Sequence, residues 1–274
     1  MGAVPAVTLQ TVQLDGQPVH VRRGGDDDEV PILYLHGIPT SSYDWLAPLA
    51  LGGGIAVDLP GFGRSGKRGD LDYSLYGHAT FIGRLLDSLE IERVRLCVHD
   101  WGAAAGLVWA MSAPERVQRL VIVNGVPLLP GFRWHRPARL ARLPIVGEIV
   151  VGLATRSVLG FASRRASAGR GPMPKSFVAS AAEGFDQGTQ RAVLRILRSA
   201  TAESLAAAGE GLSRVTAPAL VLWGAEDPYI PARFGAGYAA TLGDGTLETV
   251  PDAGHWPWID RPQLSERIVA YLSG

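Results

Sequence analysis

Short apolar runs recur along the chain and alternate with turns and amphipathic stretches. Six of these runs are rich in branched aliphatic side chains: 32–35, 54–58, 94–98, 120–124, 220–223 and 247–250. Strands that are continuously apolar belong to a sheet covered on both faces. The stretches between them have helical spacing, as at Ile82, Leu85, Leu86 and Leu89. This alternation predicts an α/β fold with a mostly parallel sheet flanked by helices.

Two parts of the chain depart from this alternation. The first two candidate strands, 7–14 and 19–23, alternate apolar and polar side chains, which predicts a hairpin and brings the sheet to eight strands. Residues 126–212 are helical in character and contain no strand-turn-helix unit. We predict that 126–212 is an inserted helical cap and that 1–125 and 213–274 together form the core domain.

Composition narrows the class of protein. The chain has 274 residues, enough for one substantial core, and 26 basic residues balance 26 acidic ones, so nothing indicates a nucleic-acid partner. The single cysteine, Cys97, excludes an internal disulfide framework. The first seven residues lack the features of a signal peptide, and no apolar stretch is long enough for a membrane span. We therefore expect a cytoplasmic protein without a membrane span.

Basic residues are concentrated in the predicted cap. Residues 126–200 contain twelve Lys or Arg against Glu148, Glu183 and Asp186, so the net charge of this segment is 12 − 3 = +9. A solvated helical surface is the simplest explanation. The alternative is a lid that attracts anionic substrates or docks an acidic partner or a membrane surface. The sequence leaves both interpretations open.

An acidic residue occupies the turn between one buried strand and the following helix. Asp100 lies between the apolar run 94–98 and the small-residue stretch 103–106. Such a turn holds its central residue in a strained, exposed conformation above the first N–H groups of the helix. The helix dipole favours an ionised carboxylate there, which suits a nucleophile. Asp100 is alternatively no more than the N-cap of the helix.

Three further loops at strand ends carry polar groups. The loop 36–43 after the third strand contains a Gly-x-Pro turn that can aim a backbone N–H at a developing oxyanion. The loop 223–228 offers Asp227 as an acid, with Glu226 as the neighbouring alternative, although Asp before Pro also begins ordinary helices. The last loop contains His255. A lone loop histidine usually has no special role, but the chain order Asp100, Asp227, His255 is nucleophile, acid, base.

On these residues the chain resembles the α/β-hydrolase family over nearly its whole length, and in particular its aspartate-nucleophile branch of haloalkane dehalogenases and epoxide hydrolases. The sequence His-Asp-Trp-Gly at 99–102 is typical of that branch, whereas the Gly-x-Ser-x-Gly of esterases is absent. The resemblance implies that Asp100 forms an ester with the substrate and that His255, oriented by Asp227, activates the water that hydrolyses it. It also implies an oxyanion hole from the backbone N–H groups of Ile38 and Trp101, with no cofactor and no metal ion.

The resemblance leaves the leaving group open. In haloalkane dehalogenases the tryptophan after the nucleophile donates its indole N–H to the halide, a role that Trp101 would fill. Many of these enzymes have a second donor, Asn, where this chain has Ile38, and Trp134, the one tryptophan of the predicted cap, is the candidate to replace it. Asn124 occupies the position that supplies the acid in other dehalogenases, which favours Asp227 as the acid here.

Epoxide hydrolases usually protonate the opening oxygen with cap tyrosines, and residues 126–212 contain none; Tyr43, Tyr229 and Tyr238 lie outside the cap. We therefore predict a dehalogenase-like hydrolase that acts on a small, mainly apolar electrophile, with epoxide hydrolysis as the alternative. A cyclase or isomerase that uses the same Asp–His pair, and a catalytically silent ligand-binding protein that uses the basic cap, are further alternatives.

Overall fold

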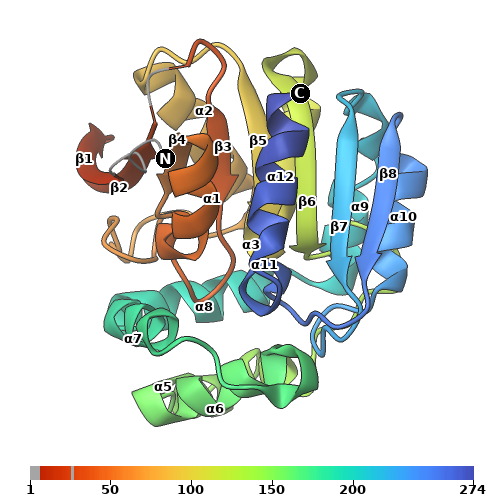
Figure 1. The fold of residues 1–274 in the computed structure, drawn as a ribbon. Coiled ribbons are helices and arrows are strands. Elements are labelled where there is room, and N and C mark those ends of the chain that lie inside the picture. The colour runs from red at the N-terminus through yellow and green to blue at the C-terminus, as the bar shows by residue number, and fades with distance from the viewer. Residues whose placement is uncertain (1–6, 26–27) are drawn as a thin grey trace.

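The computed structural model describes residues 7–25 and 28–274 and contains an eight-stranded sheet with helices on both faces (Figure 1). The strand order is β1-β2-β4-β3-β5-β6-β7-β8. Pairing is parallel from β4 through β8 and antiparallel for β1 and β2. The strands are β1 Thr8–Leu14, β2 Gln17–Gly24, β3 Ile32–Leu35, β4 Gly54–Val57, β5 Val94–His99, β6 Val117–Gly125, β7 Ala219–Gly224 and β8 Gly245–Val250. The predicted α/β fold is confirmed, because every predicted run overlaps one strand.

Each face of the sheet has its own layer of helices. Helices α1 (Leu46–Gly52) and α12 (Gln263–Ser273) pack on one face, and α2 (Leu75–Ser88), α3 (Asp100–Ser112) and α10 (Arg233–Thr241) pack on the other. Helix α3 is apolar on all sides and almost wholly buried, because it lies between the sheet and its neighbouring helices. Its small residues permit this close packing: a Cβ at position 102 would lie 2.5 Å from the carbonyl oxygen of His36.

The segment between β6 and β7 contains helices and no strand. These are α4 (Arg136–Ala141), α5 (Val146–Gly152), α6 (Arg156–Ala166), α7 (Lys175–Gly184), α8 (Gln187–Ser199) and α9 (Ala202–Ala208). Figure 1 shows α5 to α8 below the carboxyl ends of the strands. The helical content expected for 126–212 is thus observed. The division into core and cap at these boundaries stays a prediction, and residues 1–6, which the signal-peptide argument used, lie outside the described residues.

Candidate active site

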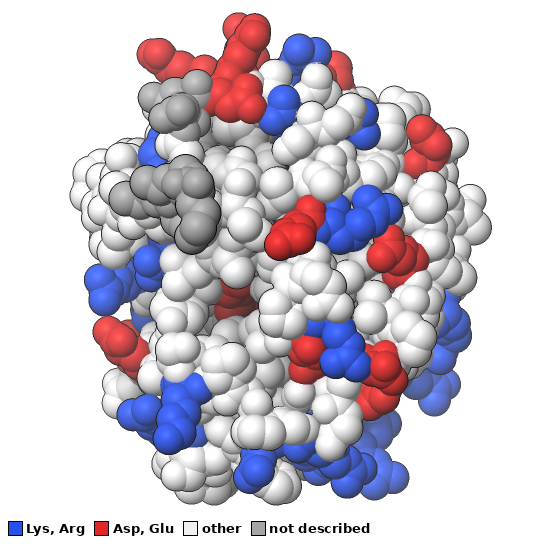
Figure 2. All heavy atoms as spheres, viewed as in Figure 1, with Lys and Arg blue, Asp and Glu red and all other residues white. Residues whose placement is uncertain are grey.

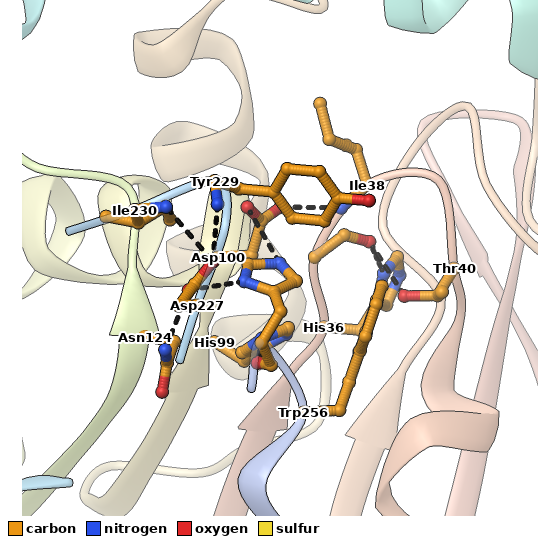
Figure 3. A network of polar contacts seen from close by, with 12 residues as sticks. His36, Ile38, Thr40, His99, Asp100, Asn124, Asp227, Tyr229, Ile230 and Trp256 are labelled. Atoms are coloured by element: carbon orange, nitrogen blue, oxygen red, sulfur yellow. Dashed lines mark hydrogen bonds and ion pairs between the residues drawn. The ribbon is translucent and has the colours of Figure 1, made fainter. Parts of the chain in front are cut away.

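Asp100 occupies a strained turn at the junction of β5 and α3. Its φ is +48°, in the region that residues other than glycine rarely adopt. A hydrogen bond from the backbone N–H of Val126 to the Asp100 carbonyl oxygen (2.9 Å) fixes the turn. The backbone N–H of Ile38 fixes one carboxylate oxygen of Asp100, since it donates a hydrogen bond to Oδ1 at 2.9 Å (Figure 3). A Cβ at Gly37 would lie 2.4 Å from the Cβ of Asp100, so this close approach requires glycine.

The loop after β8 brings His255 to the second oxygen of Asp100. The Nε2 atom of His255 lies 3.5 Å from Oδ2 of Asp100, and its Nδ1 lies 2.8 Å from Oδ2 of Asp227. The other oxygen of Asp227 accepts the backbone N–H groups of Tyr229 (2.7 Å) and Ile230 (3.0 Å). These bonds hold the Asp227 carboxylate against His255. The structure therefore brings Asp100, His255 and Asp227 together in the order that the sequence predicts.

Asn124 secures Asp227 from the end of the neighbouring strand. Its Nδ2 donates to Oδ2 of Asp227 at 2.7 Å, and its Oδ1 accepts the backbone N–H of Gly224 at 2.9 Å (Figure 3). The sequence identified Asn124 only as a position where other dehalogenases have an acid. The neighbouring alternative, Glu226, does not face the histidine, since its Oε2 accepts the backbone N–H of Gly169.

Burial and neighbouring charges shift the pKa values of Asp100 and His255. Burial disfavours the ionised form of Asp100, but its hydrogen bond and charge interaction with His255 outweigh burial and lower the carboxyl pKa. Burial likewise disfavours the imidazolium of His255, yet the charge of Asp227 and the hydrogen bonds to both carboxylates raise its pKa to about 10. At neutral pH the resting site thus contains an imidazolium between two carboxylates.

Asp100 and His255 line an apolar cavity of about 290 Å³ between the sheet and the cap helices. Its wall consists mostly of aliphatic and aromatic side chains, among them Phe132, Val151, Leu159, Phe177, Val193, Leu197 and Ile230. Several of the polar side chains in the wall are already engaged: Thr40 donates to Asp44, and Ser163 donates to the carbonyl oxygen of Gly160. Such a cavity fits a small, mainly apolar molecule.

The structure contradicts the expected role of the Trp101 indole as a donor to a leaving group. The side chain is fully buried, and its Nε1–H donates to Nδ1 of His78 at 3.4 Å, inside the packing of α3 against α2. The proposed substitute, Trp134, lines the cavity, but its Nε1–H donates to the carbonyl oxygen of Ala200 at 2.7 Å. Neither indole N–H is therefore available to a ligand. The backbone N–H of Trp101 as an oxyanion donor stays a prediction.

Two other polar side chains face the cavity. His135, at the start of α4, accepts the backbone N–H of Ala138 at Nδ1 (3.3 Å), which places its ring proton on Nε2. That Nε2–H has no hydrogen-bond partner among the residues that the structure describes. Burial lowers the pKa of His135 to about 4, so the ring is neutral. Tyr229, which the sequence placed outside the cap, also lines the cavity, with its ring 5.1 Å from that of His255. Sequence spacing alone carries no signal for either placement.

Buried histidines near the site are engaged in supporting the loops. Nε2 of His36 accepts the backbone N–H of Leu59 at 2.9 Å, and Nε2 of His99 pairs with the carbonyl oxygen of His255 at 2.9 Å. Burial lowers the pKa of both, that of His99 to about 3, so both are neutral. Within 7–25 and 28–274, no three His, Cys, Asp or Glu side chains are arranged to hold a metal ion.

Comparisons with known proteins agree with this architecture. A family described as alpha/beta hydrolase fold matches residues 30–262. The haloalkane dehalogenase of Mycolicibacterium paratuberculosis is 31% identical over 295 residues, which cover 96% of this chain and 91% of that protein. In structure the chain is similar to haloalkane dehalogenase DbeA from Bradyrhizobium elkani (24% identity, TM-score 0.84, 98% of both chains). It is also similar to epoxide hydrolase CorEH (19% identity, TM-score 0.81, 98% of this chain and 99% of that one). Because both sequence identities are below 25%, these two structural similarities show a shared fold and no more.

Proposed function

The chain belongs to the α/β-hydrolase family, in its haloalkane dehalogenase- and epoxide hydrolase-like branch, and from that premise we propose that Asp100 is the nucleophile of a hydrolase that acts on a small apolar substrate. One observation carries the proposal: a carboxylate with a lowered pKa faces an apolar cavity, with an imidazole nitrogen 3.5 Å away. Dehalogenation is the first candidate reaction.

In the first step Oδ2 of Asp100 attacks the carbon that carries the halogen. The new C–O bond forms as the carbon–halogen bond breaks, and the halide leaves with the electron pair. Oδ1 then becomes the ester carbonyl oxygen, and the Ile38 N–H that already donates to it is in place for the oxyanion of the next step. The apolar cavity favours this displacement because it removes water from the carboxylate.

The second step hydrolyses the ester. Esterification removes one of the two negative charges beside His255, so the pKa of the imidazolium falls from about 10 and its proton is lost to solvent. The neutral imidazole takes a proton from water, whose oxygen attacks Cγ of Asp100. Collapse of the tetrahedral intermediate expels the alkoxide, which takes the proton from His255 and leaves as the alcohol. The new carboxyl group of Asp100 then passes its proton to His255, which restores the carboxylate and the imidazolium of the resting site. Asp227 stabilises the imidazolium throughout.

His135 is the proposed donor to the departing halide. Its Nε2–H is a neutral N–H group in the wall of the cavity without a hydrogen-bond partner among the described residues. A hydrogen bond to a developing anion is stronger than one to a neutral acceptor, so this donor would act mainly in the transition state. It takes the role that the sequence assigned to Trp101.

Epoxide hydrolysis is the second candidate, and the position of Tyr229 favours it. Burial raises the pKa of Tyr229 to about 12, so the phenol keeps the proton that an opening epoxide requires. Its O–H donates to the carbonyl oxygen of Ala162 at 3.2 Å, a long bond for a phenol. Two substrate panels distinguish the two reactions: haloalkanes are assayed for halide release, and epoxides are assayed for diol formation.

The decisive experiment traps the ester. His255→Gln should still be alkylated at Asp100 but should not turn over, so haloalkane addition gives one equivalent of halide and an alkylated peptide that contains Asp100. Asp100→Asn is the matched control and should give neither product. Turnover by His255→Gln at the wild-type rate, or halide release without alkylation of Asp100, would contradict the mechanism. A cyclase or isomerase would give no ester in either variant.

A further inference from the structure

The segment 140–161, from the end of α4 into α6, exposes an unusual number of apolar side chains. Of the twelve large hydrophobic side chains that are exposed among the described residues, eight lie within 140–161. They are Leu140, Leu143, Ile145, Val146, Ile149, Leu153, Val158 and Phe161, which we call the apolar ridge. Ile145 is 75% exposed and Phe161 65% exposed. Apolar patches of this kind mark a surface that another phase or molecule covers.

Unpaired cations precede, interrupt and follow the apolar ridge along the chain. These eight exposed basic residues are Arg133, Arg136, Arg139, Arg156, Arg164, Arg165, Arg170 and Lys175. None of them forms an ion pair within the described part of the chain, whereas arginines on the core do, such as Arg116 with Asp87 (2.7 Å) and Arg267 with Glu248 (2.9 Å). Figure 2 shows Lys and Arg gathered along the lower margin of the molecule, over the cap helices. The ridge therefore combines apolar surface with uncompensated positive charge.

The helices that carry the ridge are suited to lie on a bilayer and not to cross it. No described helix is by itself both long and apolar enough to cross a membrane. Helices α5 and α6 reach the required length and composition only as a pair, and a bend of 93° separates them. The eleven residues of α6 span about 16 Å, roughly half the hydrocarbon thickness. Short helices with exposed apolar residues and flanking arginines are typical of interfacial binding.

We propose that the apolar ridge docks the protein on an anionic lipid bilayer, with its apolar side chains in the acyl boundary and its flanking arginines at the lipid phosphates. A second copy of the chain fits this surface less well, because two facing ridges would bring the same unpaired cations together. Docking also places the cavity at the membrane: Val158 is 48% exposed on the ridge and lines the cavity as well. On the proposed function, an apolar substrate dissolved in the bilayer would enter beside Val158.

The test measures co-sedimentation of the full-length protein with vesicles of phosphatidylcholine, alone or mixed with phosphatidylglycerol. The wild type should bind the mixed vesicles, more weakly at high salt, and bind neutral vesicles poorly. Ile149→Ser/Leu153→Ser/Phe161→Ser and Arg156→Gln/Arg164→Gln/Arg165→Gln should each lower the partition coefficient at least about tenfold. The matched control, Leu51→Ser/Tyr76→Ser/Leu247→Ser, removes exposed apolar side chains elsewhere and should bind as the wild type does. Melting temperatures verify that all variants are folded.

Several outcomes would overturn the proposal. The wild type could fail to bind anionic vesicles or bind both vesicle types equally, or both ridge variants could bind as the wild type does. The proposal would also fail if the wild type is a dimer and the serine variant is a monomer. Failure of docking is distinguishable from failure of the proposed function. Asp100→Asn should bind vesicles normally, and the serine variant should turn over a water-soluble substrate at the wild-type rate, because none of its three positions lines the cavity.

Discussion

His255 lies between two carboxylates, and in the proposed mechanism the chemistry of the site depends on it. Asp227 holds Nδ1 at 2.8 Å, and Asp100 lies 3.5 Å from Nε2. With both carboxylates ionised, the imidazolium pKa is about 10, so the resting histidine is not a base at neutral pH. In the proposed mechanism, formation of the ester removes the charge of Asp100, and this loss of charge converts His255 into a base.

Replacing Asp100 by Asn should imitate this loss of charge. The His255 pKa in Asp100→Asn should fall by at least about one unit below its wild-type value, because one of two stabilising charges is gone. Titration of the imidazole proton signals by NMR measures both values. Glu226→Gln is the control. It removes a charge next to Asp227, in the loop after β7, without contact to His255, and should leave the His255 pKa unchanged. An equal pKa in Asp100→Asn and the wild type would show that Asp100 does not control the base.

The leaving-group donor can be identified by two aromatic substitutions. His135→Phe should lower kcat for halide release about tenfold or more, because a transition-state hydrogen bond to an anion is lost. Trp101→Phe should change kcat less than about twofold, since its indole N–H donates to His78 within the core. Steady-state halide release with matched melting curves measures both. A large loss in Trp101→Phe with a normal His135→Phe would restore the role expected from the sequence.

At the scale of elements, the end of α6 supports the loop that carries His255. The backbone N–H of His255 donates to the carbonyl oxygen of Ala166 at 2.8 Å, and Asp260 accepts both the Ser167 hydroxyl (2.5 Å) and the Gly254 N–H (2.8 Å). Helix α6 thus contacts the histidine loop as well as lining the cavity. A Cβ at Gly254 would lie 2.0 Å from the Ala166 carbonyl oxygen, so the two segments meet only because residue 254 is glycine.

Gly254→Ala should therefore displace the histidine loop. We expect kcat to fall about 100-fold, the typical effect of moving a catalytic group by an ångström. Halide release measures the activity, and far-ultraviolet circular dichroism verifies the fold. Gly243→Ala is the matched control, because nothing lies within 4 Å of its added Cβ. Wild-type kcat in Gly254→Ala would mean that the contact with α6 does not set the position of His255.

At the scale of the whole molecule, the loops at the strand ends and the helices between β6 and β7 together create an apolar cavity beside Asp100 and His255. The carboxylates come from the loops after β5 and β7, while residues of α4, α5, α6, α7 and α8 form most of the apolar wall. Because the wall offers few free polar groups, burial of substrate carbon should supply most of the binding free energy.

For 1-bromoalkanes, kcat/KM should then rise with chain length until the cavity is full. Each added methylene contributes about 0.8 kcal/mol, or about fourfold. Initial rates of bromide release over the homologous series give the slope. Terminal hydroxy analogues of equal length serve as the control and should be poorer substrates, since the hydroxyl would lose its hydrogen bonds to water. A flat series, or better turnover of the hydroxy analogues, would argue against binding by apolar burial.

Local patterns in the sequence determined most of the fold and identified three side chains that the structure brings together. The continuously apolar runs predicted six of the strands, since a strand covered on both faces is apolar along its length, and alternating side chains predicted β1 and β2. Asp100, Asp227 and His255 were identifiable because each follows a strand of a parallel sheet, and the carboxyl ends of such strands meet at one edge.

The tertiary structure decided where the side chains around the triad point. Trp101 follows Asp100 directly, yet packing of α3 against α2 turns its indole toward His78. His135 and Tyr229 are far apart in the sequence and share the cavity wall, with their rings 4.7 Å apart. The direction of a side chain depends on long-range packing and on which hydrogen-bond partner burial leaves available, and neither is encoded in the spacing of residues along the chain.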